Sequence, residues 1–153
     1  MTGKEAFLRR QSEIIDRVGW AVTLVHPGAD DTDDSGPFAY TVGLTAHGCP
    51  ELLIAGLDPA IAHHLLNDLA ARVYDRAERF SHGQRVGDLI DGYDAAIIDG
   101  FPAGHLHLGA AIARYGPQQV RVQQIVWPDP AGRFPWEDGY AYPSTVQPLI
   151  GRP

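Results

Sequence analysis

The sequence predicts a single α+β or α/β domain in which one mixed β-sheet of about five strands packs against about three helices. Helical and strand-like patterns alternate along the chain in the order helix, three strands, helix, strand, helix, strand, and this order is typical of one sheet covered by helices. The chain has 153 residues, which is enough for a substantial core. Because no repeat or linker interrupts the pattern, we expect residues 1–153 to form one domain.

Three segments have helical patterns. Residues 4–18 form an amphipathic helix. Its apolar side carries Phe7, Leu8, Ile14, Ile15 and Val18. A second helix is predicted from the N-cap Asp58, with Pro59 at the first helical position, to about Ala77. Its predicted buried stripe contains Ile61, Leu65, Leu66, Leu69 and Val73. A third, short helix is predicted over residues 105–115.

Five segments are typical of β-strands because they are rich in β-branched and aromatic residues. They cover residues 20–25, 38–44, 51–57, 93–99 and 120–127. Residues 78–91 fit either a short strand or a loop. Residues 26–37 hold Pro, Gly and four Asp and predict an exposed loop, and the Pro-rich tail, residues 139–153, is expected to be extended.

The composition excludes several classes of function. The net charge is −7, and Asp30, Asp31, Asp33 and Asp34 supply much of it. Such an acidic chain disfavours binding to nucleic acid or to anionic membranes. No apolar run approaches the roughly 20 residues that span a membrane, and the charged N-terminal segment does not fit a signal peptide. A single cysteine fits a reducing compartment, so we expect a cytoplasmic protein.

Several long motifs point to a known family. They are residues 37–44 (PFAYTVGL), 50–52 (PEL), 65–67 (LLN), 124–129 (QIVWPD) and 132–136 (GRFPW). Together they resemble the bacterial domain of unknown function 4262 family over about residues 18–140. The resemblance implies a soluble, single-domain bacterial protein and implies no known chemistry.

The most distinctive segment is residues 127–136, which holds two Trp and three Pro. Three prolines exclude a helix interior or a central strand, and Trp usually buries most of its ring. We interpret this loop either as a clamp that closes the core or as a pocket rim. In the second interpretation, Trp127, Trp136 and Arg133 would suit a flat or anionic ligand. Asp129 is expected to pair with Arg133 across the turn.

Further ligand-binding candidates lie on predicted strands and on the second helix. Tyr40 and Thr41 point to opposite faces of one strand. The small residues on the Thr41 side favour close packing of a helix, and the alternative is a ligand floor with the Thr41 hydroxyl as its polar anchor. Gln124 lies among apolar residues and needs hydrogen-bond partners, which a pocket or the region of Asn67 would supply.

Catalytic and metal-binding candidates carry less specific patterns. Glu51 is a candidate general acid or base, although a structural role is favoured, either pairing with an Arg, for which Arg133 is a plausible partner, or capping a turn. His105 and His107 would point the same way on an extended segment and would then suit a metal, whereas exposed histidines are the favoured interpretation. The cofactor is left open.

Two weaker patterns have plain structural explanations. Residues 31–36 resemble half of a calcium loop but lack its final Glu, so we interpret them as a solvated turn. Cys49 lies two residues from His47 and could form a Cys–His pair, but a small buried apolar residue is favoured.

These observations leave more than one functional hypothesis. The first is a cytoplasmic binding or accessory module that recognises a protein or a small molecule through the aromatic loop, for example as the acidic partner of a basic effector. The second is a small hydrolase-type enzyme that uses Glu51 and histidines, with or without a metal. A homodimer whose interface uses the Trp loop is a third. Convergence of Glu51, Gln124, Arg133 and a histidine in one concave site would favour the enzyme.

Overall fold

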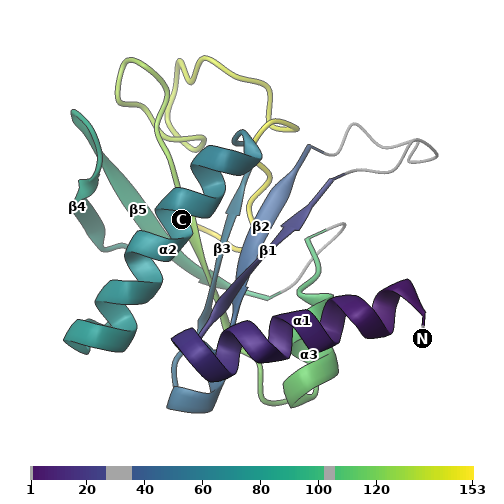
Figure 1. The fold of residues 1–153 in the computed structure, drawn as a ribbon. Helices are drawn as coiled ribbons and strands as arrows, with labels where there is room; N and C mark the ends of the chain where they lie inside the picture. The colour runs from purple at the N-terminus through teal and green to yellow at the C-terminus, as the bar shows by residue number, and fades with distance from the viewer. Residues whose placement is uncertain (1, 27–35, 102–105) are drawn as a thin grey trace.

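The computed structural model describes residues 2–26, 36–101 and 106–153. It contains three α-helices, one short 3₁₀ helix and six strands (Figure 1). In chain order these are α1 (Gly3–Val18), β1 (Ala21–Val25), β2 (Phe38–Val42), η1 (Leu44–His47), β3 (Glu51–Ala55), α2 (Pro59–Arg76), β4 (Arg85–Ile90), β5 (Tyr93–Gly100), α3 (Gly109–Tyr115) and β6 (Val122–Val126). No helix in the described ranges has the length and apolar character needed to cross a bilayer.

All six strands belong to one mixed sheet with the order β1-β2-β3-β6-β5-β4. The pair β3–β6 is parallel and the other four pairs are antiparallel. This confirms the predicted α+β fold with one mixed sheet and three helices. The sheet has one strand more than expected, because the ambiguous segment 78–91 contributes β4. That strand has a register shift between Val86 and Ile90 with Asp88 at φ 58°, so it lacks regular alternation.

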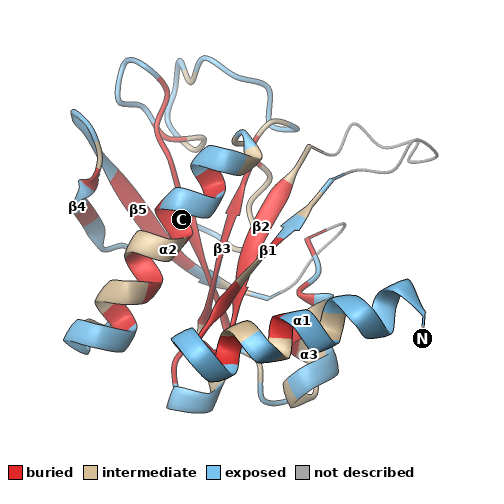
Figure 2. Ribbon diagram, viewed as in Figure 1, coloured by how far each residue is buried: buried red, intermediate tan, exposed pale blue. Residues whose placement is uncertain are grey.

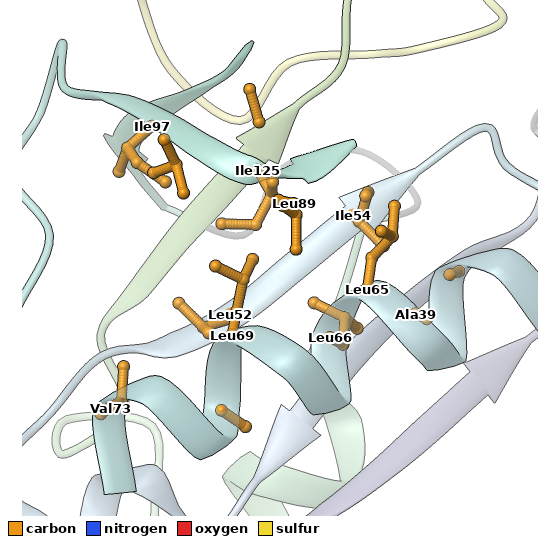
Figure 3. Close-up of a cluster of buried hydrophobic side chains, with 14 of the residues drawn as sticks. Ala39, Leu52, Ile54, Leu65, Leu66, Leu69, Val73, Leu89, Ile97 and Ile125 are labelled. Carbon is orange, nitrogen blue, oxygen red and sulfur yellow. The ribbon is translucent and has the colours of Figure 1, made fainter. Parts of the chain in front are cut away.

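Helix α2 covers one face of the sheet. Asp58 caps it by accepting a hydrogen bond from Ala60 N, with Pro59 in the first turn, as predicted. Its buried stripe packs on the sheet residues shown in Figure 3. The labelled side chains are Ala39, Leu52, Ile54, Leu65, Leu66, Leu69, Val73, Leu89, Ile97 and Ile125. Ala39 is fully buried there, which confirms that the small face of β2 lies against a helix. Each large aliphatic side chain buried in this way contributes about 1.5–3 kcal/mol.

Helices α1 and α3 lie on the opposite face, where Ile15 and Ala111 join a second buried cluster with β2 and β3. Arg114 of α3 donates a hydrogen bond to Ser12 of α1, so the two helices are neighbours. The predicted apolar side of α1 is only partly buried. Phe7 is 47% exposed and Figure 2 shows most of the helix surface as exposed. The buried residues of α1 are Gln11 and Ile15, and Gln11 donates a hydrogen bond to the Thr23 hydroxyl of β1.

The C-terminal residues 146–151 have no regular secondary structure, and Leu149 and Ile150 pack against the buried cluster of the second face. Two buried glutamines hold them. Gln124 of β6 donates to Pro148 O (2.8 Å) and accepts from Ile150 N (2.9 Å). Gln147 of the tail donates to Trp127 O and accepts from Trp127 N, both at 2.9 Å. Each side-chain amide thus donates to a backbone C=O and accepts from a backbone N–H, as the backbone of a neighbouring strand would.

Glycines let this tail approach the strands closely. A Cβ at Gly56, just after β3, would clash with the carbonyl oxygen of Val146. A Cβ at Gly100, at the end of β5, would clash with the carbonyl of Ile150. The tail therefore runs from the end of β3 to the end of β5, across β6.

We predict that Gln147→Ala lowers the free energy of unfolding by about 2–4 kcal/mol, because it removes hydrogen bonds to both backbone groups of Trp127 and leaves them buried without partners. Urea unfolding followed by circular dichroism measures this. Gln118→Ala is the matched control, since Gln118 is exposed. Equal stability of the two variants would contradict this role of Gln147.

Candidate functional site

Trp127 forms one wall of a groove at the end of β6. Its indole N–H donates to Ala55 O (2.7 Å), which fixes the ring over the end of β3. The ring of Tyr142 lies beside it, with centroids 5.7 Å apart. Although Trp127 is mostly buried, part of its ring faces the groove. The structure therefore agrees with the interpretation of Trp127 as a residue packed onto the core.

We define the aromatic groove by the six residues Ile61, Leu65, Leu89, Tyr93, Trp127 and Tyr142, which line it together with the adjacent loop residues. Its volume is about 400 Å³, within the range of small-molecule sites. It lies between the start of α2, the β4–β5 turn and the loop after β6, at the top of Figure 1. A larger hollow of about 750 Å³ lies along residues 87–94, but its lining is mostly polar and offers little apolar contact.

Asp129 organises the loop next to this groove. One carboxylate oxygen accepts hydrogen bonds from Ala131 N and Arg133 N (both 2.9 Å), and the other accepts from Ala141 N (3.0 Å). Burial opposes the negative charge, but these backbone N–H donors outweigh it and hold the pKa of Asp129 below its usual value. The expected pairing of Asp129 with Arg133 is thus made by the backbone, and the Arg133 guanidinium donates instead to Gly139 O (3.3 Å).

The predicted rim of Trp127, Trp136 and Arg133 is not formed. Trp136 stacks on Phe134, with ring centroids 5.1 Å apart and planes 7° apart. Both rings pack against the cluster on the α1 and α3 face, whereas Trp127 belongs to the α2 face. The loop crosses the end of the sheet between Trp127 and Phe134, so the two Trp residues lie on opposite sides of it.

Glu51 is fully buried at the start of β3, where it caps a turn and does not pair with Arg133. Its carboxylate accepts hydrogen bonds from the Thr41 hydroxyl, the Thr45 hydroxyl and backbone N–H groups of the turn around η1. Burial raises the pKa of Glu51, while the Thr45 and Thr41 donors act in the opposite direction. The carboxylate is enclosed by its donors, so this geometry is that of a turn anchor.

Tyr40 and Thr41 are also held in the interior. The Tyr40 hydroxyl accepts from Ala110 N (2.9 Å) in the first turn of α3, and burial raises the pKa of Tyr40. The Thr41 hydroxyl donates to Glu51 and accepts from Leu52 N. These contacts join helix to sheet and strand to strand, and neither side chain lines the aromatic groove.

Asn67 and Gln124 are not brought together. Asn67 accepts from the Trp20 indole N–H (2.9 Å) and donates to His63 (3.0 Å), so α2 is tied to the residue before β1. His63 and Asn67 are four residues apart and so are neighbours on the helix surface. Gln124 finds its partners in the C-terminal tail on the other face of the sheet.

The histidines within the described residues do not converge. His107 is exposed between two buried leucines, and His105 lies outside the described residues, as do residues 31–36. The part of the chain that is described contains no group of three or more metal-ligand side chains. Cys49 is buried and its Sγ contacts the backbone oxygen of His47, whose ring packs on Tyr74. The Cys–His pair is therefore not formed.

Sequence reasoning missed Tyr93 and Tyr142 as walls of the groove. Tyr93 starts β5 and donates to Pro130 O (2.8 Å), which ties the β4–β5 turn to the Trp loop. Tyr142 comes from the tail. The sequence signal for Tyr142 was the pair of tyrosines in residues 140–142. The position of these residues beside Trp127 depends on the strand order, which the local sequence pattern does not give.

We predict that Glu51→Gln lowers the free energy of unfolding by about 1–3 kcal/mol, because the amide NH₂ group would face the N–H and O–H donors of Thr45. Chemical denaturation at neutral pH measures the change. Glu13→Gln, at an exposed position of α1, is the control. A Glu51→Gln variant as stable as the control would show that the carboxylate does not anchor this turn.

Asp129→Asn tests the lowered pKa of Asp129. Because the folded-state pKa lies below the usual value of 3.8, the charged Asp129 stabilises the fold above about pH 3.8 and loses this effect as the pH falls through the folded pKa. The stability difference between wild type and Asp129→Asn should therefore be largest at neutral pH and shrink below pH 3.8. Urea unfolding across a pH series measures it, with Asp16→Asn as the exposed control. A difference that grows in acid would contradict the assignment.

The chain was also compared with known proteins. No curated protein and no solved structure matches it. The family model described as a domain of unknown function, DUF4262, matches residues 14–141. The matched region begins within α1 and ends at Ala141, so it contains the whole sheet, the Trp loop and most of the groove wall. The protein belongs to the DUF4262 family.

Proposed function

We propose that this protein is a non-catalytic binding module that takes a small, flat, apolar ligand in the aromatic groove. The observation that carries the proposal is the groove itself, in which one Trp and two Tyr rings meet around a volume of about 400 Å³. Aromatic walls with a few polar groups are typical of small-molecule sites. Ile61 supports this further, because an isoleucine that is 51% exposed at a groove offers apolar contact without being needed in the core.

The charge at the groove favours a ligand with a positive group. Asp91 lines the groove, is exposed and makes no ion pair within the described residues. Arg133, which the sequence placed at the rim, directs its guanidinium to Gly139 O instead. A cationic group on the ligand could therefore approach Asp91 and the faces of the tyrosine rings. We propose an aromatic amine as the ligand class.

The hydrolase alternative has less support. Glu51 is enclosed by its hydrogen-bond donors, so no substrate atom could reach its carboxylate without opening the turn at η1. Glu51, Gln124 and Arg133 do not share a concave site, since each has a separate set of partners.

The single cysteine is unbridged, which supports our proposal of a cytoplasmic location for this module.

Three related probes test the groove, namely indole, tryptamine and indole-3-acetate, which are neutral, cationic and anionic. We expect each to shift the NMR signal of the Trp127 indole N–H, while the signals of Trp20 and Trp136 stay in place. Ile61→Arg should weaken indole binding at least fivefold by removing apolar contact and crowding the groove. Phe7→Arg is the matched control, because Phe7 is a similarly exposed apolar residue on another helix.

Asp91→Asn removes the carboxylate charge but keeps the size of the side chain, so it tests the contribution of charge to ligand binding. Wild type should bind tryptamine about two- to fivefold more tightly than indole-3-acetate at low salt, as for an exposed charge pair, and the variant should lose this preference. If none of the probes shifts the Trp127 signal, the proposal is wrong. Concentration-dependent sedimentation that Ile61→Arg abolishes would instead assign the groove to a homodimer interface.

A further inference from the structure

A second groove lies at the opposite end of the sheet, where β5 ends and β3 and β6 begin. In the strand register, Val122 pairs with Glu51 on one side and with Gly100 on the other. The groove has a volume of about 630 Å³ and is lined by the turn before β3, the segment after α2, the end of β5 and the start of β6. We call it the polar groove and define it by Arg79, His82, Asp99, Phe101, Arg121 and Gln123.

The two arginines bring two positive charges to the polar groove, against the single carboxylate of Asp99 among its lining residues. Arg121 donates to Gly48 O (2.6 Å), and Arg79 donates to Val73 O (3.2 Å) and Glu78 O (2.8 Å). Carbonyl oxygens hold the guanidinium groups in place without cancelling their charge, and within the described residues most of the five N–H donors of each make no hydrogen bond. Neither arginine forms a salt bridge with any described residue. This is notable in a chain whose net charge is −7.

The polar neighbours add one donor, and the hydrogen bond to the Asp99 carboxylate leaves its negative charge in place, so the two arginines exceed it by one positive charge. Asp99 N donates to His82 Nδ1 (2.9 Å), so in the neutral ring the proton sits on Nε2, which is a donor. The Asp99 carboxylate accepts from Gln123 Nε2 (2.9 Å), and that amide also donates to Phe80 O. The groove therefore offers two guanidinium groups and one imidazole N–H, which is a donor set suited to an anion.

Phe101 supplies an apolar surface beside these donors. It is 83% exposed, the most exposed of the large apolar side chains in the described residues. An aromatic ring left in water at the edge of a cationic groove is positioned to contact the uncharged part of a ligand. A phosphate has three terminal oxygens and two negative charges, which match the three donor groups better than a single carboxylate does.

From these observations we propose that the polar groove binds a small phosphate monoester whose phosphate contacts Arg79, Arg121 and His82 and whose apolar group contacts Phe101. This site is independent of the aromatic groove, because no lining residue is shared between them. Its failure or success leaves the proposed function of the aromatic groove unchanged.

Calorimetric titration with phenyl phosphate and with inorganic phosphate, at constant ionic strength, tests the proposal. We expect phenyl phosphate to bind more tightly than inorganic phosphate. Arg121→Gln should weaken binding of phenyl phosphate at least tenfold. Arg9→Gln, which removes an exposed arginine of α1, should leave binding unchanged. Thermal unfolding of both variants checks that they are folded.

Phe101→Ser tests the apolar contact without disturbing the core, since the side chain is exposed. This variant should bind phenyl phosphate only as tightly as inorganic phosphate. Binding that is equal in wild type, Arg121→Gln and Arg9→Gln would overturn the proposal, because it would reflect general attraction of anions. Absence of saturable binding by wild type would overturn it as well.

Discussion

The pairing of the Gln147 amide with the backbone of Trp127 is the interaction on which the groove end of the molecule depends. It is buried, it satisfies both backbone groups of the residue that follows β6, and its donor group also contacts the Tyr140 hydroxyl. The same contact fixes the position of the tail that carries Tyr142, which is the second aromatic wall. Because a buried amide is costly to leave unpaired, the tail, the end of β6 and the groove wall form one unit.

At each end of the sheet, a buried carboxylate accepts hydrogen bonds from the backbone N–H groups of a loop or turn. Asp129 collects the N–H groups of the loop after β6, and Glu51 collects those of the turn before β3. The two differ in the balance of forces, since backbone donors lower the pKa of Asp129 whereas burial raises the pKa of Glu51. From the sequence, Glu51 was a catalytic candidate and Asp129 a candidate for pairing with Arg133. Their complete sets of donors explain why an acidic residue at a strand end has a structural use in this fold.

The sequence predicted those parts of the fold that local patterns control. Asp58 and Pro59 fixed the start of α2, and the leucine spacing fixed its buried side. Strand β4 was ambiguous because the backbone at Asp88 breaks its alternation. Ile61 was expected in the core but lies at the groove, since periodicity along a helix does not show where the underlying sheet ends.

Most of the site could not be predicted because it depends on strand order. Trp127 was recognised as a packed residue from its composition and its neighbouring prolines. Tyr93 meets it only because β5 and β6 are neighbours and β5 runs in the opposite direction. Trp136 was assigned to the same rim because it is close in sequence, yet the loop carries it to the other face. Proximity along a Pro-rich loop is therefore a weak guide to proximity in space.

The two grooves also differ in charge, and the sheet separates them. Six residue steps lead along β6 from Arg121 to Trp127, which corresponds to about 20 Å at the usual rise of a strand. That distance exceeds the roughly 8 Å over which salt screens exposed charges at physiological ionic strength. Asp91 at one end and the two arginines at the other are therefore screened from each other. Since β6 is buried along its whole length between them, the two grooves share no surface, so the cation preference that we propose for one does not weaken the anion preference that we propose for the other.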